Sequence, residues 1–121
     1  MKRALVLVDH GSRRPEANAQ LDALAERVRA RVSDRFVQVA HMEQASPSIE
    51  QAVAACVAAG AEEIVVHPYF LGPGNHTRVD IPRLVGEAAA QHPGLRIAIS
   101  EPLGLDEKLV ELVLARVEEA G

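Results

Sequence analysis

Four short apolar runs that alternate with four helical patterns are the feature that most restricts the fold of this 121-residue chain. The runs lie at 4–8, 36–40, 64–66 and 95–99, and their short length and β-branched residues favour strands. Apolar residues recur every three or four positions across 17–32, 48–59, 81–91 and 107–119, which is typical of amphipathic helices. Strict alternation of strands and helices indicates a parallel sheet.

The first and third runs are apolar at successive positions, as expected for central strands that helices cover on both faces. We therefore predict an α/β fold with a four-stranded, doubly wound parallel sheet in the order 2-1-3-4. A chain of this length has room for one domain only, residues 1–121. The predicted N-caps are a serine within 46–48 for the second helix, Asp80 for the third and Asp106 for the fourth.

Composition excludes several classes of function. With 2% aromatic residues and a formal net charge of −4, the chain offers neither a base-stacking platform nor a basic surface, so we expect no nucleic-acid partner. Its single cysteine, Cys56, lies in an apolar helix stripe and is interpreted as a core residue. No apolar run is long enough to cross a membrane, and the first one is too short for a signal peptide, so we expect a cytoplasmic protein.

The residues best suited to chemistry follow the strands. In an open parallel sheet, ligands bind beyond the carboxyl ends of the strands, where the strand order reverses, which here means the loops after the first and third strands. These loops carry His10 and His76, and the loop after the second strand carries Glu43. Imidazole is the commonest metal ligand and a ready proton acceptor, and a nearby carboxylate can serve as a proton acceptor or a third ligand.

The same loops hold glycines and arginines. Glycine permits close approach of the backbone, and the helix N-termini after these loops present N–H groups to anions. Arginine adds donors that suit a ligand rich in carboxylates. The residues concerned are Gly11, Gly72, Gly74, Arg13, Arg14 and Arg78. Their spacing matches neither a dinucleotide fingerprint nor a P-loop, so we predict no nucleotide.

Each histidine also has a simpler interpretation. His10 and His76 could be ordinary loop residues, and Glu43 could be a solvated loop acid. His41 should share the side of the strand that carries Glu43, which makes it an optional participant. We interpret His67 as structural; His92, beside Pro93 and Gly94, is interpreted as a surface turn residue, and neither joins the predicted site.

Four segments of the chain form a specific combination of motifs. They are His-Gly-Ser-Arg with Pro-Glu-Ala-Asn at 10–18, Met-Glu-Gln-Ala-Ser-Pro-Ser at 42–48, the glycine-rich 68–82 and Glu-Pro-Leu-Gly at 101–104. Together they resemble the sirohydrochlorin chelatases of the short CbiX type, a family of class II tetrapyrrole chelatases. The resemblance covers essentially the whole chain. It implies a one-lobed enzyme that inserts Co²⁺, Fe²⁺ or Ni²⁺, as substrate, into sirohydrochlorin or a near relative, without a permanently bound cofactor.

Carried over position by position, the resemblance implies that His10 and His76 handle the metal and that Glu43 is the acidic residue paired with them. The expected contacts with the tetrapyrrole come from Gly11, Ser12, Arg13, Gly72, Gly74, Asn75 and Arg78. Because two-lobed relatives are about twice this length, a homodimer around a shared cleft is implied. The chain departs from the family pattern at His67, where an apolar residue is usual, and at Gly74-Asn75 before His76.

Two other functions use the same residues. A metal carrier would employ the histidines without binding a tetrapyrrole. A phosphotransfer enzyme would need several arginines around a histidine, whereas only Arg13 and Arg14 follow His10 closely.

Overall fold

The computed structural model describes residues 2–121, apart from the side chain of His76. The strands are β1 (Arg3–Asp9), β2 (Arg35–His41), β3 (Glu63–Pro68) and β4 (Arg96–Ile99). The α-helices are α1 (Pro15–Arg29), α2 (Ile49–Ala58), α3 (Ile81–Ala89) and α4 (Glu107–Ala120). A π-helical turn, η1 (His76–Asp80), leads into α3 and was not predicted from the sequence.

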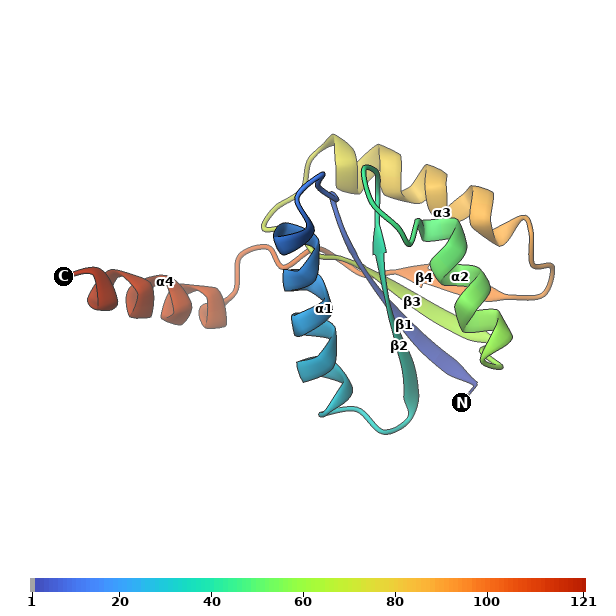
Figure 1. Ribbon diagram of the computed structural model, residues 1–121, viewed down its shortest axis with the longest axis horizontal. Helices are drawn as coiled ribbons and strands as arrows, with labels where there is room; N and C mark the ends of the chain where they lie inside the picture. Colours follow the sequence, from blue (N-terminus) through green and yellow to red (C-terminus); the bar gives the residue numbers. More distant parts are fainter. Residues whose placement is uncertain (1) are drawn as a thin grey trace.

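The sheet has the order β2-β1-β3-β4 with every pair of neighbours parallel, which confirms the predicted topology. Helices α2 and α3 cover one face, and α1 covers the other face over β1 and β2 (Figure 1). The central strands β1 and β3 are apolar because helices cover the sheet on both faces. Val6, Val8 and Val66 are fully buried toward α2 and α3, and Leu7 is buried toward α1. The strand order reverses between β1 and β3, and in open parallel sheets ligands bind beyond the carboxyl ends of the strands at such a point.

Cys56 lies in the α2 side of this core with no exposed surface, as predicted. Burial disfavours the thiolate and raises the pKa of the Cys56 thiol to about 11. The thiol is therefore a small apolar core group rather than a nucleophile.

Two of the three predicted helix caps are confirmed. Ser48 accepts a hydrogen bond from the backbone N–H of Gln51, whose side chain accepts one from the Ser48 N–H, forming a capping box. Asp106 accepts a hydrogen bond from the Lys108 N–H at 2.8 Å. Asp80 occupies the predicted N-cap position before α3, but η1 already makes its backbone helical and its side chain makes no capping bond.

Helix α4 forms where the pattern predicts it, but it projects away from the sheet at one end of the molecule (Figure 1). None of its residues is buried. Within residues 2–121, no helix is both long and apolar enough to cross a membrane.

Candidate functional site

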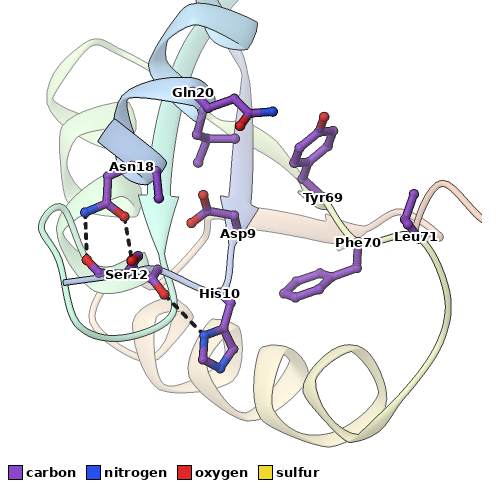
Figure 2. Close-up of a pocket in the computed structure, with 11 residues that line it drawn as sticks. Asp9, His10, Ser12, Asn18, Gln20, Tyr69, Phe70 and Leu71 are labelled. Carbon is purple, nitrogen blue, oxygen red and sulfur yellow. Dashed lines mark hydrogen bonds between the residues drawn. The ribbon is translucent and has the colours of Figure 1, made fainter. Parts of the chain in front are cut away.

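The loops after β1 and β2 and the segment after β3 converge at the carboxyl edge of the sheet, as the topology predicts. A cavity of about 400 Å³ opens there, lined by residues from the end of β1, the first turns of α1 and the segment after β3 (Figure 2). Its lining residues are Asp9, His10, Gly11, Ser12, Ala17, Asn18, Gln20, Leu21, Tyr69, Phe70 and Leu71. Imidazole, carboxylate and amide groups thus face a mostly apolar hollow.

His10 and Glu43, which lie 33 positions apart in the sequence, meet at this edge. The Nε2 atom of His10 is 3.2 Å from Oε1 of Glu43, and both side chains are about half exposed. The other ring nitrogen, Nδ1, lies 3.2 Å from the carbonyl oxygen of Gly11. Because the backbone N–H of Glu43 also donates to the His10 carbonyl at 3.1 Å, the two loops are held in register beyond the strands. The structure therefore brings together two of the three predicted catalytic residues, His10 and Glu43.

Gly11 makes this close approach possible. It has a φ of +91°, a backbone conformation that only glycine adopts without strain. A Cβ atom at this position would lie 1.8 Å from the carbonyl oxygen of Glu43. A side chain here would push the first two loops apart, so the glycine is required for the contact between His10 and Glu43.

The start of α1 fixes the rest of the first loop. The Ser12 N–H donates to the side-chain oxygen of Asn18 at 3.0 Å, and the Asn18 amide donates to the Ser12 carbonyl at 2.8 Å (Figure 2). Arg13 donates through Nε to the side chain of Gln44 at 3.0 Å. These bonds hold Ser12 and Arg13, two predicted substrate contacts, at the rim and tie the first loop to the second.

A second acid–histidine pair lies behind the first, and sequence reasoning missed it. Nδ1 of His41 is 2.5 Å from Oδ1 of Asp9, with the His41 side chain only 2% exposed. The prediction that His41 shares a side with Glu43 was wrong, because β2 ends at His41 and strand alternation does not extend to Glu43. The parallel pairing of Asp9 with His41 in the sheet was the signal that could have indicated this contact.

The third predicted loop is described only in part. The backbone of His76 begins η1, but its side chain lies outside the described residues, so its predicted role as a metal ligand stays a prediction. Gly72, Gly74 and Asn75 are exposed, and a Cβ at either glycine would meet no atom within 4 Å. Arg78 lines a different hollow of about 360 Å³, beside Glu101 and the end of β4.

Among the side chains that the structure describes, no three His, Cys, Asp or Glu residues are grouped so that they could hold a metal ion. His10 and Glu43 form a two-residue arrangement of imidazole and carboxylate, a donor set that suits first-row divalent metals. Two exposed donors favour transient over permanent binding of a cation.

His67 lies on β3 outside the cavity, in keeping with its interpretation as a structural residue. Its Nδ1 is 2.8 Å from the hydroxyl oxygen of Ser100. Burial lowers the pKa of His67 below its ordinary value of 6.5, and a hydrogen bond with the backbone of Glu101 opposes this shift in part.

Comparison with known proteins gives one consistent result. Residues 4–120 match the family model described as CbiX. The chain is 40% identical over 114 residues to the chloroplastic sirohydrochlorin ferrochelatase of Arabidopsis thaliana, covering 94% of this chain and 51% of that protein. It is 33% identical over 138 aligned positions to the sirohydrochlorin cobaltochelatase of Methanococcus maripaludis, covering 93% and 96% of the two chains.

The solved structures agree with this match. The cobalt complex of the sirohydrochlorin chelatase SirB from Bacillus subtilis superposes with a TM-score of 0.93 at 36% identity, over 98% of this chain and 51% of that one. The CbiX protein from Marinobacter aquaeolei superposes with a TM-score of 0.83 at 30% identity, over 98% and 96%. The chain thus spans about half the length of the plant and Bacillus relatives and nearly all of the Methanococcus and Marinobacter ones. By sequence and by fold, the chain belongs to the CbiX family.

Proposed function

We propose that this chain inserts a divalent metal ion, Co²⁺, Fe²⁺ or Ni²⁺, into sirohydrochlorin or a close relative. The observation that carries the proposal is the contact of 3.2 Å between His10 Nε2 and Glu43 Oε1 at the ligand-binding edge of the sheet. Support comes from relatives of both lengths that are named sirohydrochlorin ferrochelatases and cobaltochelatases.

The pair of His10 and Glu43 suits the delivery of a metal ion. When Nδ1 of His10 carries the proton and donates it to the Gly11 carbonyl, the lone pair of Nε2 faces the Glu43 carboxylate. Two electron-rich atoms in this position attract a cation between them. Imidazole and carboxylate bind Co²⁺, Fe²⁺ and Ni²⁺ less tightly than a set of thiolate ligands would. The ion can therefore be released to the ring. We expect His76 to complete this set.

Metal insertion also displaces two protons from pyrrole nitrogens. We propose that Glu43 accepts protons at its carboxylate, since it is half exposed and can pass them to water.

The tetrapyrrole carries many carboxylates, and the loops around the cavity offer donors to them. We expect Arg13, Arg78, Ser12 and Asn75, with the backbone of Gly11, Gly72 and Gly74, to hold the edge of the ring. One lobe supplies one wall for a flat macrocycle, so we propose a homodimer that encloses it. We place this activity in the cytoplasm.

The experiment that tests this function follows the absorbance of sirohydrochlorin during anaerobic incubation with the chain and each metal in turn. We expect insertion well above the uncatalysed rate with at least one metal, and its loss in His10→Ala and His76→Ala. His92→Ala, at the turn after α3, is the matched histidine control and should retain activity. Metal binding without any change in the ring spectrum would indicate a carrier and contradict the proposal.

A further inference from the structure

The buried pair of Asp9 and His41 is used by no step of the proposed function. Nδ1 of His41 lies 2.5 Å from Oδ1 of Asp9, and the His41 and Asp9 side chains are 2% and 22% exposed. A hydrogen bond to a carboxylate that is shielded from water is strong and demands a defined geometry. Figure 2 shows the Asp9 carboxylate and the His10 ring on opposite sides of the end of β1, as strand alternation requires. Asp9 therefore acts on its neighbour through the backbone.

The pair closes the sheet at the point where the first two loops begin. Asp9 and His41 are the last partners in the parallel register of β1 and β2. Beyond them, the Met42 N–H donates to the Asp9 carbonyl at 3.0 Å, and the Glu43 N–H donates to the His10 carbonyl at 3.1 Å. The side-chain bond thus lies one residue before His10 and two residues before Glu43, so any movement of the pair is passed directly to both.

His41 also fixes the base of the loop that carries Glu43. Its backbone N–H donates to the Pro47 carbonyl at 2.8 Å, which closes the loop of residues 42–47 at its two ends. Helix α2 follows at once, with Ser48 as its N-cap. Through its backbone and its side chain, His41 therefore joins β2, the end of this loop and the end of β1.

This loop contains a strained residue directly after Glu43. Gln44 has a φ of +71°, a conformation that residues other than glycine avoid and that persists where surrounding contacts fix it. Arg13 donates through Nε to the Gln44 side chain at 3.0 Å, but both side chains are exposed. Of these two side-chain links between the first and second segments, the one between Asp9 and His41 is shielded from water. It is therefore the firmer of the two supports.

The contact between His10 and Glu43 needs such support. Nε2 of His10 is 3.2 Å from Oε1 of Glu43, yet both side chains are about half exposed. The separation of the two groups is consequently only as well defined as the backbone of their loops. Supporting residues around metal ligands are typically worth about 10- to 100-fold in metal affinity.

We propose that Asp9 and His41 are positioning residues, which hold the loops of His10 and Glu43 at the separation that a divalent metal ion requires. Because this proposal rests on the proposed function, it adds two residues to the capture of the ion. Without the pair, the ion itself has to draw His10 and Glu43 together, so metal affinity falls. Once the ion is bound, the two groups are again in place, so the maximal rate and the binding of the tetrapyrrole are retained.

The first test measures the binding of Co²⁺ alone, without a tetrapyrrole, by competition with a chromophoric chelator. His41→Leu keeps an apolar side chain of similar volume and removes the N–H, whereas His41→Asn keeps an N–H near the position of Nδ1 and leaves part of the ring volume empty. We expect His41→Leu to weaken Co²⁺ binding by about 10-fold or more and His41→Asn to remain within about threefold of wild type. Circular dichroism verifies that each variant is folded.

Two further variants serve as controls. His67 is likewise partly buried, with Nδ1 2.8 Å from the Ser100 hydroxyl oxygen, but this contact joins β3 to the segment after β4. His67→Leu makes the same substitution away from the site and should leave Co²⁺ affinity unchanged. His10→Ala gives the background of Co²⁺ bound elsewhere on the chain.

The kinetics of metal insertion separate positioning from a loss of folded protein. In His41→Leu, we expect KM for the metal to rise by the same factor as the dissociation constant, while kcat and KM for sirohydrochlorin stay within about twofold of wild type. A smaller folded fraction would instead lower the rate at every metal concentration and leave KM unchanged. Asp9→Ala combined with His41→Leu should bind Co²⁺ no more weakly than the weaker single variant, because both remove one bond.

Three results would contradict the proposal while leaving the proposed function in place. Native Co²⁺ affinity in His41→Leu would make the pair a purely structural contact. Equal losses in His41→Leu and His41→Asn would assign the effect to packing rather than to the bond. A loss in Asp9→Ala with native affinity in His41→Leu would make Asp9 a direct ligand. By contrast, a wild type that binds Co²⁺ no better than His10→Ala would contradict metal capture in the proposed function, and the positioning role with it.

Discussion

Nδ1 of His41 lies 2.5 Å from Oδ1 of Asp9, which joins the last residues of the neighbouring strands β2 and β1. Asp9 directly precedes His10 in the sequence. His41 is 2% exposed, so this contact is shielded from water on the histidine side. The backbone N–H groups of Met42 and Glu43 continue the pairing by donating to the carbonyls of Asp9 and His10. The pair therefore supports the loops that carry the candidate metal-handling residues.

Removing His41 should destabilise the whole domain. His41→Ala leaves a cavity and deprives the Asp9 carboxylate of its partner, so we expect the free energy of unfolding to fall by about 3 kcal/mol. Urea denaturation measures this change. Glu43→Ala is the matched control: its side chain is half exposed, and we expect a change within about 0.5 kcal/mol. Equal effects of the two substitutions would contradict a structural role for the buried pair.

Gly11→Ala should be costly, because it adds a Cβ 1.8 Å from the Glu43 carbonyl at a φ of +91°. We expect a loss of at least about 2 kcal/mol in the free energy of unfolding. The control is Gly86→Ala in α3, where a Cβ meets no atom within 4 Å and alanine favours the helix. The free energy of unfolding of that variant should rise by up to about 1 kcal/mol. A tolerated Gly11→Ala would show that the first two loops can separate without penalty.

The sequence pattern was sufficient for the topology because parallel strands and crossover helices have few possible arrangements. It also placed His10 and Glu43 at one edge, since the carboxyl ends of parallel strands coincide. It did not indicate the contact between Asp9 and His41, which depends on where β2 ends. Nor did it reveal η1, which at five residues is too short to show a period, or the direction of α4, which depends on the backbone bonds of the segment before it.

The lowered pKa of His67 makes stability depend on pH in a defined direction. Burial keeps the pKa of folded His67 below 6.5, so the unfolded chain binds a proton more readily. This contribution to stability is complete above about pH 6.5 and is lost as the pH falls from there toward the lower folded pKa. His67→Gln should remove this pH-dependent contribution, because the glutamine side chain does not titrate.

Urea denaturation between pH 7.5 and 5 measures this dependence. We expect the stability of wild type to fall relative to His67→Gln as the pH is lowered, while all other histidines are common to both proteins. His92→Gln serves as the matched control and should follow wild type. Parallel curves for wild type and His67→Gln would contradict the proposed effect of burial on His67.

Glu43→Gln keeps the shape of the side chain and removes its charge. If the Glu43 carboxylate accepts the pyrrole protons, turnover of sirohydrochlorin should fall by about 10²-fold or more. The amide can still contact His10, whose Nε2 lies 3.2 Å from Oε1 in the native protein, so binding of the tetrapyrrole should be largely retained. Rates of metal insertion and a spectroscopic binding titration measure the two effects separately.

The dependence of the insertion rate on metal concentration distinguishes two roles for Glu43, metal ligand and proton acceptor. If the carboxylate serves only as a metal ligand, Glu43→Gln should approach the native rate as metal is raised to saturation. If it accepts protons, the deficit should persist at saturation, because a carboxamide cannot take up a proton near neutral pH. Glu50→Gln, at the exposed first turn of α2, is the matched control and should leave both rate and binding unchanged. A native rate for Glu43→Gln at every metal concentration would leave His10 and His76 as the remaining proton acceptors.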